Sequence, residues 1–213
     1  MLISAIKGNL NFYQIIISVI SSLAVIFFTL PIHEWAHGFV STKLGDPTPK
    51  YQGRLTLNPM AHIDWVGAAA ILLFGIGWAK PVQVNARYYK NPKWGMALVA
   101  LAGPLSNIIT AFIALLLHYI IYTVLILVNA SVEVYLAVFN LIPIPPFDGS
   151  RILFTFLPQK YYFKIMLYER YIFVVLFVLL YIGIFDAPIS FLSNGILNAI
   201  NSLARFPLKL FGV

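Results

Sequence analysis

Long uncharged apolar stretches alternate along the chain with short basic segments. Residues 8–32 include no Asp, Glu, Lys, Arg or His, and residues 95–132 include only His118. Each stretch exceeds the roughly 20 apolar residues that a helix needs to cross the hydrocarbon core of a bilayer. Two weaker apolar stretches follow over residues 171–185 and 187–204. The pattern therefore predicts a polytopic membrane protein built from helices.

Turn-forming residues divide these stretches into predicted elements. The first helix is predicted over residues 13–44 and ends at Gly45-Asp46-Pro47. The second is predicted over residues 95–128, and Asn129-Ala130-Ser131 separates it from a third segment over residues 132–156. The third segment contains three prolines, so we do not expect it to form one regular helix.

A shorter apolar stretch lies between the first two predicted helices. Residues 66–77 are too few to cross a bilayer, which favours a re-entrant or surface-lying element. Val82-Gln83-Val84-Asn85 alternates like a short β-strand. If the stretch crossed the membrane, one of its basic flanks would lie outside, against the positive-inside rule. These flanks contain Lys43, Lys50, Arg54, Lys80, Arg87, Lys90 and Lys93.

Composition agrees with this picture. The chain is 61% hydrophobic and only 10% charged, which is too little charge for a surface exposed to water. The expected fold class is an all-α polytopic membrane protein with a small re-entrant or β element between the first and second core helices. We expect a single domain over residues 1–213, with a three-helix core at about 13–157 and two C-terminal helices at about 171–205. The absence of cysteine excludes disulfides and thiolate zinc ligands.

The net charge of +7 could indicate nucleic-acid binding in a soluble protein. Here the basic residues lie between apolar spans, so we expect them to contact anionic membrane lipid on the cytoplasmic side. We expect no nucleic-acid partner. In this topology the first and third core segments run in the same direction. His37, 6 residues before Lys43, and Asp148, 12 residues before Lys160, then both lie near the cytoplasmic face of the cell membrane.

Two histidines and a glutamate occur at the end of the first apolar stretch. His33 and His37 are four residues apart, so on a helix they share one face and can bind one zinc ion. Glu34 can act as a general base toward water at that ion. Such polar groups inside a membrane are costly and are functional by default. The alternative is a pair of buried histidines bonded to backbone carbonyls.

A catalytic zinc site needs a third protein ligand and an open fourth position. Asp148 is the candidate in the proline-broken segment, where irregular backbone is tolerated only beside protein or a wet cavity. Asp148-Gly149 is also a common turn pair, so these residues alone leave both interpretations open. His62 and Asp64 are expected to be solvated or structural. The full set of candidates is His62, Asp64, His118, Glu133, Asp148 and Glu169.

The sequence from His33 to His37 reads His-Glu-Trp-Ala-His, and the sequence from Asn140 to Gly149 reads Asn-Leu-Ile-Pro-Ile-Pro-Pro-Phe-Asp-Gly. Together these motifs resemble the site-2 protease family of intramembrane zinc metalloproteases, over roughly residues 15–156. The resemblance implies that His33, His37 and Asp148 bind Zn²⁺. It also implies that Glu34, between the two histidines, is the general base.

Two asparagines gain a role from the same resemblance. Asn140 matches an asparagine of the site-2 protease family whose expected role is to hold the substrate strand or the developing oxyanion. Gly103-Pro104-Leu105-Ser106-Asn107 is similar to the family's Gly-x-x-x-Asn element, which implies a related role for Asn107 but is also typical of helix packing. The chain has no room for the PDZ or CBS domains of many relatives, so it looks like a minimal form.

The expected function is therefore hydrolysis of peptide bonds in or near transmembrane segments. The substrate would be a transmembrane protein or a signal peptide, and its helix must unwind locally before cleavage. Residues 82–85 could pair with the unwound strand, or they could form a surface hairpin. A zinc or other cation transporter and a catalytically inactive membrane scaffold are the alternatives from other classes.

Overall fold

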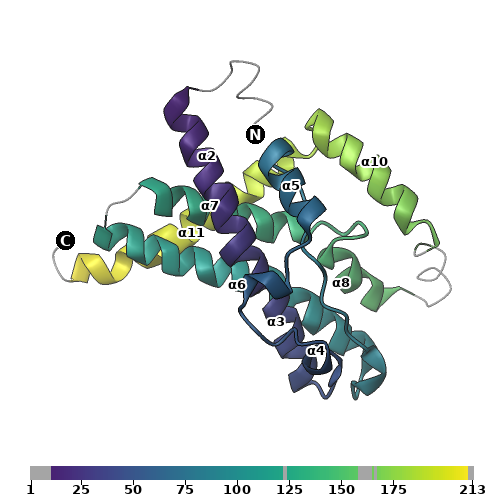
Figure 1. Ribbon diagram of the computed structural model, residues 1–213. Coiled ribbons are helices and arrows are strands. Elements are labelled where there is room, and N and C mark those ends of the chain that lie inside the picture. Colours follow the sequence, from purple (N-terminus) through teal and green to yellow (C-terminus); the bar gives the residue numbers. More distant parts are fainter. Residues whose placement is uncertain (1–10, 122–123, 158–164, 166, 211–213) are drawn as a thin grey trace.

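All regular secondary structure in the described part of the chain is helical. The computed structural model (Figure 1) describes residues 11–121, 124–157, 165 and 167–210. Two helical stretches, Phe12–Lys43 and Pro92–Tyr119, are long and apolar enough to cross a membrane. The all-helical class is thus confirmed, and two of the expected spans are present.

The first predicted helix is continuous but contains one widened turn. Helix α2 (Phe12–Ala24) passes through a π-helical turn (Val25–Thr29) into α3 (Leu30–Lys43). Pro31 lacks an N–H, and its ring conflicts with the carbonyl group of Phe27 in a regular α-helix. A π turn rearranges the backbone hydrogen bonds at this point, so the helix continues past the proline.

Helices α6 (Pro92–Ile121) and α7 (Val124–Asn140) pack against each other at the centre of the fold. The predicted break at residues 129–131 is wrong, because these residues lie inside α7. Ala130 is fully buried in a cluster with side chains of α6 and α11. The hydroxyl of Ser131 donates to the backbone carbonyl four residues earlier. Tertiary packing therefore overrides the local preference for a turn.

The third predicted segment is interrupted at its prolines, as expected. Helix α7 ends at Asn140, residues 141–147 form turns, and α8 (Asp148–Phe156) follows. The peptide bond between Pro145 and Pro146 is cis. Beyond these turns, α8 packs against α6. Asp148 is therefore the first residue of a short helix that returns to the core.

The short apolar stretch forms a hairpin beside the π turn. Helix α5 (Trp65–Phe74) ends at Gly75, whose φ of 82° lies in the left-handed region. Apolar side chains of α5 pack against those of the π turn. The backbone N–H of Lys80 donates to the carbonyl oxygen of His62 at 2.8 Å. The chain therefore returns to the place where the hairpin began, and both flanks lie on the same side of it.

The β-strand predicted at residues 82–85 is wrong. This segment has no regular secondary structure, and the described residues contain no strand that could pair with it. Two carboxylates bind its backbone instead. The N–H of Val82 donates to Oε2 of Glu34 at 2.8 Å, and the N–H of Asn85 donates to Oδ2 of Asp46 at 2.7 Å.

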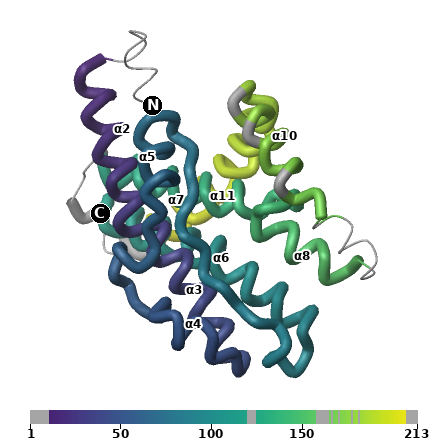
Figure 2. Tube along the Cα trace, turned by 45° about the vertical axis from the view of Figure 1, so that its right-hand side comes forward, coloured from purple at the N-terminus to yellow at the C-terminus, as the bar shows by residue number. Residues whose placement is uncertain are grey.

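Both predicted C-terminal helices are present as α10 (Glu169–Ile182) and α11 (Asp186–Leu210). Helix α11 packs across α6 and α7. Helix α10 stands away from these central helices in Figures 1 and 2. Phe173 of α10 contacts Trp78 edge-to-face, with 6.1 Å between the ring centroids. The remaining elements are α4 (Thr48–Tyr51) and the 3₁₀ turns Pro59–Ala61 and Ala86–Tyr88.

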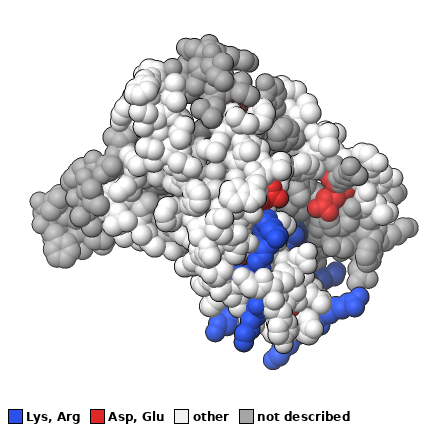
Figure 3. All heavy atoms as spheres, in the orientation of Figure 1, with Lys and Arg blue, Asp and Glu red and all other residues white. Residues whose placement is uncertain are grey.

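On the visible face of the molecule (Figure 3), basic residues gather at one end. On the face shown in Figure 3, Lys and Arg cluster around the lower end, near α3, α4 and the start of α6, and the upper part is nearly uncharged. An exposed apolar stripe runs along α6, with one side chain every three or four residues. This arrangement is unfavourable in water and favourable in lipid. The stripe consists of Leu98, Leu101, Leu105, Ile109, Ile113 and Leu117.

We expect Gly67→Ala to destabilise the α5 hairpin. A Cβ at Gly67 would overlap the carbonyl oxygen of Trp78 and lie 2.9 Å from its carbonyl carbon, so the backbone would have to shift. Overpacking of this kind costs about 1–3 kcal/mol, which lowers the Tm of a chain of this size by several degrees. Gly195→Ala is the matched control, because nothing lies within 4 Å of a Cβ at that position. Equal melting temperatures of the two variants in detergent would contradict the hairpin packing.

Candidate metal centre

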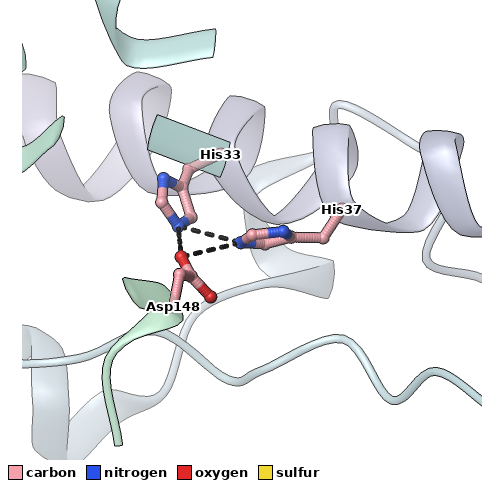
Figure 4. Close-up of side chains that lie close together, drawn as sticks. All are labelled: His33, His37 and Asp148. Carbon is pink, nitrogen blue, oxygen red and sulfur yellow. Dashed lines mark hydrogen bonds and ion pairs between the residues drawn. The ribbon is translucent and has the colours of Figure 1, made fainter. Parts of the chain in front are cut away.

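His33, His37 and Asp148 converge on one point (Figure 4). The histidines lie one turn apart on α3, and Asp148 begins α8. The two Nε2 atoms are 3.0 Å apart, and each lies 3.2 Å from Oδ2 of Asp148. The histidines are only 5% and 8% exposed. Three potential ligand atoms from two distant parts of the chain therefore meet in a buried site.

Hydrogen bonds to the outer ring nitrogens orient both imidazoles. Nδ1 of His37 donates to the carbonyl oxygen of Val99 at 2.7 Å, so in the neutral ring Nε2 carries the lone pair that can bind a metal ion. Nδ1 of His33 lies 3.3 Å from Oδ1 of Asn107, which can accept in the same way. Two lone pairs and a carboxylate oxygen thus face one another. A cation held by these three groups would convert this repulsion into attraction.

The spacing of these atoms fits zinc. In a tetrahedral site with bonds of about 2.0–2.1 Å, neighbouring ligand atoms lie roughly 3.3 Å apart. The three observed separations of 3.0–3.2 Å are close to this value. Two imidazoles and one carboxylate are also a ligand set found in catalytic zinc sites, where the fourth position is left open.

Gly103 of α6 leaves space beside the ligand atoms. A Cβ at this position would lie 2.6 Å from Nε2 of His33 and still closer to Nε2 of His37. A side chain would therefore press directly on the coordinating nitrogens. The Gly-x-x-x-Asn element thus contributes both of its ends to the centre, because Gly103 provides room and Asn107 orients His33.

Glu34 and Asn140 line a cavity of about 500 Å³ that also contains the three ligand residues. We call it the metal cavity. Oε2 of Glu34 accepts the hydrogen bond from the N–H of Val82, and the side-chain amide of Asn140 donates to a backbone carbonyl one turn earlier. Asn107 is only 1% exposed and lies behind His33. Its position favours orientation of the ligand over contact with substrate.

None of the other candidate ligands belongs to this group of three. His62 is fully buried and its Nε2 donates to a backbone carbonyl, and Asp64 caps the N-terminus of α5. Both are structural. Glu133 is buried in α7, where it accepts a hydrogen bond from a threonine of the π turn at 2.6 Å. His118 lies in the last turn of α6. Glu169 begins α10 and lines the metal cavity, but its carboxylate is not part of the ligand group.

Sequence reasoning missed a polar cluster that anchors residues 82–85. Asp46 is fully buried and accepts hydrogen bonds from the hydroxyl of Ser41 and from the backbone N–H groups of Thr48 and Asn85. Burial alone would raise the pKa of Asp46, but these hydrogen bonds hold it below its ordinary value. The sequence indicated only a Gly-Asp-Pro helix stop, and the function of its carboxylate as an anchor required the fold.

Comparison with known proteins identifies relatives. The chain is 40% identical over 169 residues to "Putative zinc metalloprotease YwhC" of Bacillus subtilis, covering 73% of this chain and 76% of that protein. It is 31% identical over 155 residues to "Putative zinc metalloprotease MJ0611" of Methanocaldococcus jannaschii, covering 66% and 72%. It is 29% identical over 138 residues to "Putative zinc metalloprotease Rip2" of Mycolicibacterium smegmatis, covering 57% and 51%. No family model matches the chain, and no solved structure matches it significantly.

The helical fold and its buried centre of two histidines and one aspartate define a zinc metalloprotein. The chain belongs to the family of zinc metalloproteases that includes YwhC. Zinc is therefore the cofactor that His33, His37 and Asp148 would hold.

We expect Gly103→Ala to lower the zinc affinity by about tenfold or more, a range typical of altered groups next to ligands. The added Cβ would displace the imidazoles without changing any ligand. Elemental analysis of the purified protein measures the zinc content, and circular dichroism checks that the helices remain. Gly195→Ala should retain zinc. Full zinc occupancy in Gly103→Ala under competition by a chelator would contradict the packing described.

Proposed function

We propose that this chain is an intramembrane zinc endopeptidase of the site-2 protease type. It hydrolyses peptide bonds in or near the transmembrane segments of membrane proteins or of signal peptides. One observation carries the proposal: the His33, His37 and Asp148 centre, with Glu34 beside it, lies toward the end of a helix apolar enough to cross a membrane. A zinc centre there can reach only peptide bonds at or within the bilayer.

The distribution of charge supports an active site near the cytoplasmic face of a multi-pass cell-membrane protein. Basic residues cluster where α3 ends (Figure 3), and cytoplasmic segments are enriched in such residues. His37 precedes Lys43 by six residues, which is about 9 Å along a helix. Water can therefore enter the metal cavity from the cytoplasmic side over a short path.

Each of these cavity residues has a separate role in peptide hydrolysis. Glu34 takes a proton from the attacking water and later delivers it to the leaving amine. His33 and His37 keep fixed orientations, because their Nδ1 atoms are held by an amide oxygen and a backbone carbonyl. Asn140 lines the cavity and can donate to the substrate strand or the developing oxyanion. When bound, zinc supplies a Lewis acid that polarises the scissile carbonyl and lowers the pKa of water.

Residues 82–85 offer backbone groups that could bind an unwound substrate strand. Their two ends are anchored by Glu34 and Asp46. Between these anchors, the backbone groups of Gln83 and Val84 form no hydrogen bond with any described residue. Val84 also lines the metal cavity. An extended substrate could therefore pair with this backbone and replace the hydrogen bonds lost when its helix unwinds.

The arrangement of ligands favours catalysis over cation transport. Transport sites generally place several ion-binding groups along a path between broken helices. The described residues contain one compact group of three metal-binding side chains, with a glutamate beside it.

We expect Glu34→Gln to abolish cleavage of a model single-span substrate and to retain zinc. Loss of a general base typically lowers the rate by about 10²–10⁴-fold, and the glutamine oxygen can still accept from the N–H of Val82. Gel-based cleavage in detergent or nanodiscs, together with zinc analysis, measures both properties. Cleavage by Glu34→Gln at the parent rate would contradict the assigned chemistry. Zinc flux by a parent protein that cleaves nothing would favour transport.

We expect Val84→Pro to weaken cleavage mainly through a higher KM, because proline removes the backbone N–H that would pair with substrate. Val84→Ala is the matched control, since it shortens the same side chain and keeps the N–H. Steady-state kinetics with the same substrate separates KM from kcat. Identical kinetics for the proline and alanine variants would show that the substrate does not pair with the backbone N–H of Val84.

A further inference from the structure

Three cavities join into one groove that passes through the metal centre. The metal cavity shares Val82, Val84 and Arg151 with a second cavity of about 610 Å³, which we call the polar cavity. Through a different set of residues, including Leu30 and Leu136, it adjoins a third cavity of about 320 Å³, which we call the apolar cavity. The groove therefore has two chemically different ends with the metal centre between them.

The polar cavity contains an arginine, Arg151, whose guanidinium is not bound by any side chain in the described part of the chain. Among its described lining residues the charged ones are Lys93, Arg151 and Glu169, so cations outnumber anions. Nζ of Lys93 lies 3.5 Å from the carbonyl oxygen of Leu157. The guanidinium of Arg151 forms no hydrogen bond or ion pair with any described residue, including Asp148 on its own helix. A free guanidinium in a groove is suited to binding a carboxylate.

Arg151 lies about one helical turn from the metal-centre residue Asp148. It follows Asp148 by three residues on α8, so the two side chains start about 5–6 Å apart. It also lines both the metal cavity and the polar cavity. An extended peptide advances about 3.3 Å per residue. A substrate side chain about two to four residues from the scissile bond can therefore reach the guanidinium.

The apolar cavity indicates which way a substrate would lie in the groove. It lies between α2, α5 and α7, and most of its lining comes from apolar residues such as Val25, Ile71 and Leu136. An unwound transmembrane segment would place its apolar side chains there. The chain on the other side of the scissile bond would then run into the polar cavity, toward the basic end of the molecule.

We propose that Arg151, supported by Lys93, selects substrates that carry an acidic side chain about two to four residues from the scissile bond on the polar side. This inference rests on the proposed endopeptidase function, and it names the class of substrate: an apolar segment followed at the cleavage point by an acidic juxtamembrane flank. The guanidinium binds the substrate carboxylate and thereby sets which peptide bond lies at the metal centre.

The test uses the full chain in nanodiscs of neutral lipid with three single-span substrates. These substrates differ only in one pair of flanking residues, which is Glu-Glu, Gln-Gln or Lys-Lys. We expect the parent to cleave the Glu substrate with a kcat/KM about tenfold above that of the Lys substrate. Arg151→Glu should reverse this ratio, and a gain on the Lys substrate cannot arise from misfolding. Lys50→Glu is the matched control, because Lys50 is exposed on α4 outside the groove, and it should keep the parent preference.

The outcomes separate this inference from the proposed function. Cleavage of all three substrates with equal kcat/KM, or an unchanged preference in Arg151→Glu, would overturn the inference alone. If the parent cleaves none of them, the endopeptidase function fails and the inference fails with it. The same measurements are repeated in nanodiscs that contain anionic lipid. If Arg151→Glu lowers cleavage of all three substrates equally, and only in these anionic nanodiscs, Arg151 binds a lipid headgroup and the inference is wrong.

Discussion

Three electron-rich atoms held within 3.2 Å of one another constrain the rest of this structure. Two imidazole lone pairs and a carboxylate oxygen repel each other strongly in a site with little water. The surrounding helices fix each group, and a divalent cation bound between them would offset the repulsion. Several parts of the fold hold these atoms in place, and the cavities around them would give a substrate access.

Different elements of the fold position the three candidate ligands. The π turn carries α3 past its internal proline, so His33 and His37 remain on one helical face. Helix α6 supplies the carbonyl of Val99, the amide of Asn107 and the open space at Gly103. The proline-containing turns before α8 bring the aspartate back to the histidines. Rigid backbone elements therefore carry the centre, which keeps the ligand geometry accurate.

The groove links this centre to its surroundings. Glu34 faces the metal cavity and also anchors the backbone at Val82, so the proposed base and the proposed substrate-pairing segment are held in a fixed relation. Helix α10 forms one wall of the metal cavity and makes little other contact with the central helices. The chemistry thus lies between a rigid side, built from α3, α6 and α8, and a side closed by a single helix.

The sequence by itself determined the long helices, the short hairpin, the turn at the prolines and the shared face of His33 and His37. These follow from local rules, because hydrophobic length and helical spacing act over a few residues. Only the tertiary structure brought Asp148, among the candidate third ligands, next to the histidines and placed Asn107 behind His33. It also removed the predicted break at residues 129–131 and the predicted strand at residues 82–85. Each of these depends on partners distant in the chain: a carboxylate that anchors a backbone N–H, or a buried alanine that keeps a helix continuous. Local propensity contains no information about such contacts, so the sequence indicated the zinc chemistry while packing determined the groove around it.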